Sequence, residues 1–262
     1  MIITKYIILS IIQGFTEPLP ISSSGHLKIF ETILYNKYIP DMNFEIVVNF
    51  GSLLGIMFFY RKKIINIIYD FLSYIKSKDK KYKNNFDYGI KIIIGSIPVG
   101  LIGLFIKDIL EEYSSIKLVG ISLIITSFFL YLIKDKIGYK NKEHMSYLDA
   151  FIIGLYQVFA LIPGISRSGA TITGCMNQNL TREAALNYSF MLYIPVSLAG
   201  LIVSIKDINL STILYPYSIC IIVSAIITYF STKLFINIMK NGKLIYFVIY
   251  CLISGLFVFF CI

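Results

Sequence analysis

The stretch QGFTEPLPISSSGH, residues 13–26, interrupts an apolar segment with Pro, Gly and Ser. A similar stretch, QVFALIPGISRSGA, occupies residues 157–170 and shares six identities with the first over fourteen positions. The apolar segments 2–12 and 147–162 are each shorter than the ~20 residues that a membrane-spanning helix needs. Irregular backbone at membrane depth requires protein or water to satisfy its polar groups. The two interruptions therefore predict two broken or re-entrant helices beside a cavity.

The composition places these interruptions in a membrane protein. Of the 262 residues, 56% are hydrophobic and 15% are charged, against roughly 45–50% and about 25% in an ordinary soluble domain. The mean hydropathy of +0.74 excludes a soluble or disordered chain. Barrel strands show alternating segments of about 10 residues, whereas these apolar runs are long and continuous, so we predict an all-α polytopic protein. Six segments are long enough to cross the membrane: 44–60, 86–106, 116–133, 185–205, 212–230 and 244–262.

The net charge of +9 would suggest nucleic acid as a partner for a soluble protein, but in a membrane protein it indicates basic cytoplasmic loops. Basic residues gather in 61–83, 134–142 and 233–243, and one orientation places all three on the cytoplasmic side. Residues 64–75 are apolar with basic flanks, which favours an amphipathic helix on the inner surface or a simple linker.

The similarity of the two interrupted stretches indicates a duplication within one membrane domain, residues 1–262. Repeat one covers about 1–135 and repeat two about 147–262. Each half is expected to hold one re-entrant helical hairpin and three crossings, and an odd number of crossings inverts the second half relative to the first. We therefore expect the two hairpin tips to meet near the bilayer midplane.

Three ionisable residues lie in these stretches: Glu17, His26 and Arg167. A charge at the bilayer centre costs at least ~2.5–3.5 kcal/mol unless it finds a partner or water, so such residues are functional candidates. Arg167 and backbone N–H groups of the glycine-rich loops suit a tetrahedral anion, above all phosphate. Helix N-termini near Ser24 and Ser168 would add to the attraction.

The same loops hold groups that suit a reaction. Ser22 or Ser23 offers a nucleophile, His26 a proton donor or acceptor, and Glu17 a base, a group that orients His26, or a metal ligand. Ser and Gly clusters also serve close helix packing, and a Glu–Arg pair can be structural. Asn49, at the start of a span, either lines the cavity or packs.

These motifs resemble the undecaprenyl-diphosphatase family, the bacitracin-resistance type of membrane phosphatase. The similar motifs are Gln13 to Glu17 with Ser22 to His26, and Pro163 to Thr171. The resemblance implies an inverted-repeat helical bundle in the bacterial plasma membrane, with a site that faces outside. It also implies hydrolysis of undecaprenyl diphosphate, which recycles the lipid carrier for peptidoglycan synthesis.

The resemblance also implies a set of site residues. The expected catalytic residues are Glu17, Ser23, His26 and Arg167. The expected substrate-binding residues are Gln13, Ser22, Ser24, Gly25, Ser166, Ser168 and Thr171. A divalent cation, Mg²⁺ or Ca²⁺, is expected at Glu17 with Gln13, although Gln13 is an amide where many members carry a carboxylate.

Several alternatives stay open at this point. A second lipid-phosphatase superfamily requires a Ser-Arg pair, five intervening residues and then a His, but Thr173 stands at that position after Ser166 and Arg167, so that assignment fails. Inverted repeats with broken helices also occur in transporters, so a transporter or lipid flippase is the rival class. Attack by a serine or by an activated water, and a homo-oligomer or a monomer, are undecided alternatives.

Overall fold

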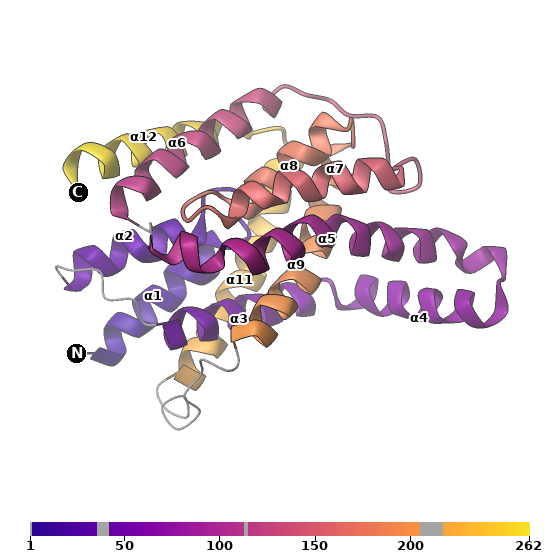
Figure 1. Cartoon of the computed structure of the whole chain (residues 1–262), viewed down its shortest axis with the longest axis horizontal. Coiled ribbons are helices and arrows are strands. Elements are labelled where there is room, and N and C mark those ends of the chain that lie inside the picture. Colours follow the sequence, from indigo (N-terminus) through magenta and orange to yellow (C-terminus); the bar gives the residue numbers. More distant parts are fainter. Residues whose placement is uncertain (1, 36–41, 113–114, 205–216) are drawn as a thin grey trace.

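The computed structural model describes residues 2–35, 42–112, 115–204 and 217–262. These residues form helices and, apart from one bridge that pairs Lys140 with Leu180, no strand (Figure 1). The α-helices are α1 Ile2–Thr16, α2 Ser23–Tyr35, α3 Met42–Phe59, α4 Arg61–Ser77, α5 Lys83–Glu112, α6 Ile116–Ile133, α7 Tyr147–Val158, α8 Arg167–Asn177, α9 Arg182–Ser204, α11 Tyr217–Lys240 and α12 Ile245–Cys261. Two 3₁₀ helices, Lys80–Tyr82 and Phe159–Leu161, precede α5 and follow α7. The predicted all-α class is confirmed.

Both predicted interruptions are breaks between helices. The helix α1 ends at Thr16, just before Pro18 and Pro20, which lack the N–H that a helix interior requires. The chain resumes as α2 at Ser23. In the second stretch α7 and its 3₁₀ extension end at Leu161, and α8 starts at Arg167. Each loop delivers a helix N-terminus to the interior of the protein.

Four of the described helices are long and apolar enough to span a membrane, or five if the bent pair α3–α4 forms one span. The helix α12 is apolar but shorter, and the stretch 205–216, which includes the start of the fifth predicted span, lies outside the described residues. The prediction that this span ends at 230 is wrong, because α11 continues to Lys240. Its last turns keep an inward face through Ser231, Phe235 and Met239, all buried.

The predicted helix over 64–75 is present as α4, which bends by 77° from α3. It lies beside α5, and together they form the hairpin that projects on the right of Figure 1. Large apolar side chains on α4 are exposed, among them Ile65 and Leu72. This exposed face is what a helix in contact with lipid requires.

Small residues let the long helices of the two halves pack closely. A Cβ at Gly55 of α3 would lie 2.5 Å from the carbonyl oxygen of Ala225 on α11, and one at Gly120 of α6 would lie 2.9 Å from the backbone nitrogen of Phe259 on α12. Such close approach is typical of helix pairs in membranes. Because α11 packs on α3 and α12 on α6, helices that are far apart in the chain lie side by side.

Candidate active site

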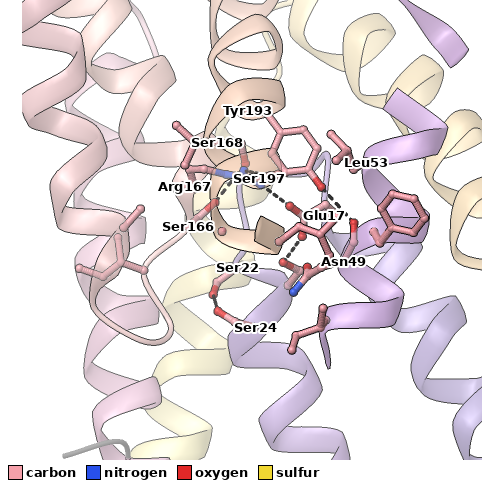
Figure 2. Close-up of a pocket in the computed structure, with 18 of the residues that line it drawn as sticks. Glu17, Ser22, Ser24, Asn49, Leu53, Ser166, Arg167, Ser168, Tyr193 and Ser197 are labelled. Carbon is pink, nitrogen blue, oxygen red and sulfur yellow. Dashed lines mark hydrogen bonds and ion pairs between the residues drawn. The ribbon is translucent and has the colours of Figure 1, made fainter. Parts of the chain in front are cut away.

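A cavity of about 360 Å³ lies where the two interrupted stretches meet (Figure 2). One side is polar and comes from the two loops: Glu17, Ser22, Ser23, Ser24, Ser166, Arg167 and Ser168. The opposite side is largely apolar and comes from α3 and α9, with Ile46, Phe50, Leu53, Val196 and Leu201. Residues about 150 positions apart thus share one chamber with a polar and an apolar wall. That combination suits an amphiphile with an anionic head.

Glu17 is the acceptor at the centre of the polar wall. It is 7% exposed, and its Oε1 accepts a hydrogen bond from Nη2 of Arg167 within an ion pair. Its Oε2 accepts from the hydroxyl of Ser23 and, at 2.8 Å, from Nε2 of Gln13. A carboxylate that accepts the proton of a serine hydroxyl has the geometry of a base beside a nucleophile.

Arg167 is held on its face and its edge. Its guanidinium carbon lies 3.7 Å from the ring centroid of Tyr193, and Nη1 donates to the hydroxyl of Ser197 at 3.0 Å. Tyr193 and Ser197 lie one turn apart on α9, so a single helix face carries both contacts. The sequence alone does not identify Tyr193 and Ser197 as site residues. The signal that could have located them is two polar positions one helical turn apart inside a predicted span. A cation stacked on an aromatic face keeps its in-plane N–H donors for anions.

Two helix N-termini reach the cavity with the same capping pattern. The hydroxyl of Ser22 accepts from the backbone N–H of Gly25 at 3.2 Å, and the hydroxyl of Ser166 accepts from that of Gly169 at 3.1 Å. In each loop the serine two positions after the capping serine is hydrogen-bonded to it, as Figure 2 shows for Ser22 and Ser24. Both helix dipoles therefore favour an anion in the cavity.

Other predicted site residues lie just behind the cavity wall. Thr171 hydrogen-bonds to the carbonyl of Arg167 and to Ser189, so it supports the first turn of α8. Gln13 contacts Glu17 from behind and donates to Oδ1 of Asn49 at 2.7 Å. Asn49 itself lines the cavity.

His26 also lies outside the cavity lining. Its ring is 3% exposed, and both nitrogens are hydrogen-bonded, Nδ1 with the carbonyl of Ser22 at 2.7 Å and Nε2 with the hydroxyl of Tyr250 at 2.6 Å. The structure therefore unites Glu17 with both serine loops and Arg167, and directs His26 toward α12.

The donors around Glu17 are compatible with a hard divalent cation. The described residues contain no cluster of three or more His, Cys, Asp or Glu side chains. However, Oε1 of Gln13 is buried without a hydrogen-bond partner in the structure, while Nε2 of the same amide donates to the carboxylate of Glu17. Oxygen donors of this kind are those that Mg²⁺ and Ca²⁺ take, with substrate phosphates completing the shell of Mg²⁺ sites.

Comparison with known proteins agrees with this geometry. Residues 6–257 match the family model described as Bacitracin resistance protein BacA. The chain is 47% identical over 258 residues to Undecaprenyl-diphosphatase 2 of Bacillus thuringiensis, covering 97% of this chain and 95% of that protein. It is 42% identical over 262 residues to Undecaprenyl-diphosphatase 1 of Bacillus licheniformis, covering 98% and 97% of the two chains. It is 39% identical over 263 residues to the undecaprenyl-diphosphatase of Oceanobacillus iheyensis, covering 98% and 95%. This chain belongs to the BacA family of bacitracin resistance proteins.

Proposed function

We propose that this protein is a membrane hydrolase that converts undecaprenyl diphosphate to undecaprenyl phosphate and inorganic phosphate. The reaction recycles the lipid carrier of peptidoglycan synthesis. The observation that carries the proposal is the contact of Glu17 with both Ser23 and Arg167 in a cavity with an apolar wall. Base, nucleophile and anion clamp thereby surround one position, and the apolar wall suits the beginning of a prenyl chain.

The contacts support an order of steps. The hydroxyl oxygen of Ser23 attacks the terminal phosphorus, its proton passes to Glu17, and the bond to the bridging oxygen breaks to release undecaprenyl phosphate. Glu17 passes that proton to the departing undecaprenyl phosphate and is ionised again. Water then attacks the phosphoserine, and Glu17 takes a proton from the water and returns it to the oxygen of Ser23 as the P–O bond breaks and inorganic phosphate is released. Arg167 and the N-termini of α2 and α8 stabilise the negative charge that develops on the phosphoryl oxygens.

A divalent cation, Mg²⁺ or Ca²⁺, would be held by Glu17 and Gln13 together with phosphate oxygens. Bound there, it would neutralise part of the diphosphate charge. Gln13 contributes a neutral oxygen, so the protein itself supplies one negative charge, from Glu17. The substrate phosphates supply the remaining negative charge around the cation. We therefore expect the cation to bind weakly to the free enzyme.

The finer architecture is part of the proposal. The shared capping pattern of Ser22 and Ser166 supports two re-entrant hairpins related by an inverted repeat. The basic loops support an orientation in which the cavity opens toward the outside of the bacterial plasma membrane. The six crossings then comprise α3, α5, α6, α9, α11 and α12, with α4 on the inner surface.

The experiment that tests the function is phosphate release by the purified full chain in lipid vesicles. Undecaprenyl diphosphate is compared with undecaprenyl monophosphate, each with Mg²⁺, Ca²⁺ or chelator. We expect cation-dependent release from the diphosphate only. Failure to release phosphate, together with transfer of undecaprenyl phosphate between the leaflets, would instead establish the rival transport function.

A further inference from the structure

His26 is held between the first serine loop and the last helix of the chain. Its Nδ1 lies 2.7 Å from the carbonyl oxygen of Ser22, and its Nε2 lies 2.6 Å from the hydroxyl of Tyr250 on α12. The two rings are stacked, with centroids 5.6 Å apart and planes inclined by 11°. These contacts occupy both nitrogens, and the ring does not line the cavity in which Glu17, Ser23 and Arg167 meet.

The partners determine which nitrogen carries the proton. A carbonyl oxygen only accepts hydrogen bonds, so Nδ1 must donate to Ser22. In the neutral ring Nε2 then lacks a proton and accepts from the hydroxyl of Tyr250. The imidazole is therefore a fixed donor to the backbone, and neither nitrogen is directed at a substrate.

The carbonyl that receives this bond belongs to a residue in an uncommon conformation. Ser22 has φ of +68°, the left-handed region that residues with a Cβ seldom adopt. Its carbonyl accepts twice from His26, from Nδ1 and from the backbone N–H at 3.1 Å. The conformation of Ser22 sets the start of α2, whose first residue is Ser23.

The second loop provides a comparison within the same molecule. Ser166 caps α8 in the same way, but the position that corresponds to His26 is Ala170, which offers only its backbone N–H to Ser166, at 2.8 Å. Ser166 has φ of −69°, an ordinary extended value. The serine with a positive φ, Ser22, thus occurs in the loop that has a histidine four residues later. The serine with an ordinary φ, Ser166, occurs in the loop that has an alanine at that position.

We propose that His26 is a positioning residue, which pins the carbonyl of Ser22 through Nδ1–H and thereby aims Ser23 at Glu17, while Tyr250 fixes the ring and its tautomer. The inference rests on the proposed function, because it assigns the chemistry to Ser23 and Glu17. It removes His26 from proton transfer and extends the machinery to α12.

The first test compares three substitutions of His26 in the phosphate-release assay. An Asn side chain places an amide N–H where Nδ1 lies, whereas a Gln side chain reaches the place of Nε2. We expect His26→Asn to keep kcat/KM within about tenfold of wild type, and His26→Gln and His26→Ala to lose about 100-fold, mainly in kcat, as a misplaced reacting group does. Thermal unfolding of all three serves as the control for folding. If Asn is as inactive as Ala in folded protein, the positioning role is overturned.

The second test does not depend on activity or on any substitution of His26. The chain has two histidines, His26 and His144, so selective ¹⁵N-histidine labelling gives a simple solid-state NMR spectrum of the full chain in bilayers. His144 is exposed, and a His144→Gln sample assigns its signals. We expect His26 to carry its proton on Nδ1 and none on Nε2. A proton on Nε2 with a bare Nδ1 would overturn the proposal, whereas wild-type protein without phosphatase activity would overturn only the proposed function.

Discussion

Glu17 and Arg167, 150 positions apart in the sequence, form a partly buried ion pair between the first interrupted stretch and the first turn of α8. The side chain of Glu17 is 4% exposed and that of Arg167 is 24% exposed, so solvent screens the pair little. Removing one partner leaves the other charge without its counterpart in a poorly solvated place. The ion pair joins the two loops into one site. The first loop supplies the proposed base, Glu17, and the second supplies the anion-binding Arg167.

Arg167→Lys should lower kcat/KM about 100-fold although the charge is kept. A lysine has no planar fork, so it cannot contact Ser197 and Glu17 together while stacked on Tyr193. The measurement is the steady-state release of phosphate from undecaprenyl diphosphate. Near wild-type activity would show that a point charge suffices and that the geometry of the clamp is irrelevant.

Ser23→Ala should lower kcat about 1,000-fold or more, because the attacking oxygen is removed and the hydrogen bond to Glu17 is lost. Acid quenching of the wild type with labelled substrate should trap phosphate on Ser23. A variant that stays within tenfold of wild type would show that water activated by Glu17 is the nucleophile.

Tyr193→Leu should weaken binding of phosphate through loss of the ring that backs Arg167. A desolvated cation–π contact contributes about 2 kcal/mol, so we expect KM and the inhibition constant of inorganic phosphate to rise about 30-fold. Tyr193→Phe is the matched control. It keeps the ring and removes only the hydroxyl, which donates to the carbonyl of Asn49 over a long distance of 3.4 Å and also interacts with Ser197 and Arg167, so both constants should rise far less than in Tyr193→Leu. Equal effects of Leu and Phe would contradict the stacking role.

Gly55→Ala should destabilise the bundle by about 1–3 kcal/mol, because its Cβ would lie 2.5 Å from the carbonyl of Ala225 and force α3 away from α11. Gly100→Ala is the matched control, since nothing lies within 4 Å of its Cβ and Ala favours a helix. Thermal unfolding in detergent should show a lower Tm for the first variant only. Equal Tm values would contradict the close packing.

The sequence predicts the breaks in α1 and α7 well, because clusters of Pro, Gly and Ser end a helix even inside an otherwise apolar segment. It also locates the residues of both loops, because Glu17 and Arg167 are costly in a membrane unless they meet. In the structure the two side chains form an ion pair.

The sequence predicts less well the contacts between residues that are far apart in the chain. Tyr193 and Ser197 belong to a helix whose pattern is that of any apolar span, so their contact with Arg167 depends on packing that periodicity does not encode. The direction of the His26 ring depends on Tyr250, 224 positions away. The sequence predicts a loop around Lys233, because basic residues gather there. The structure instead continues α11 to Lys240, since the buried face of the helix extends through Phe235 and Met239.

If the two loops form one site on one substrate, a double-mutant cycle of Glu17 and Arg167 reveals their coupling. Phosphate release from undecaprenyl diphosphate is measured for wild type, Glu17→Gln, Arg167→Lys and the double variant. Residues that act together on one transition state are strongly non-additive. We predict that the double variant is little worse than the more damaging single variant. If the losses of the two single variants multiply in the double variant, Glu17 and Arg167 act independently, and the account of a shared site is contradicted.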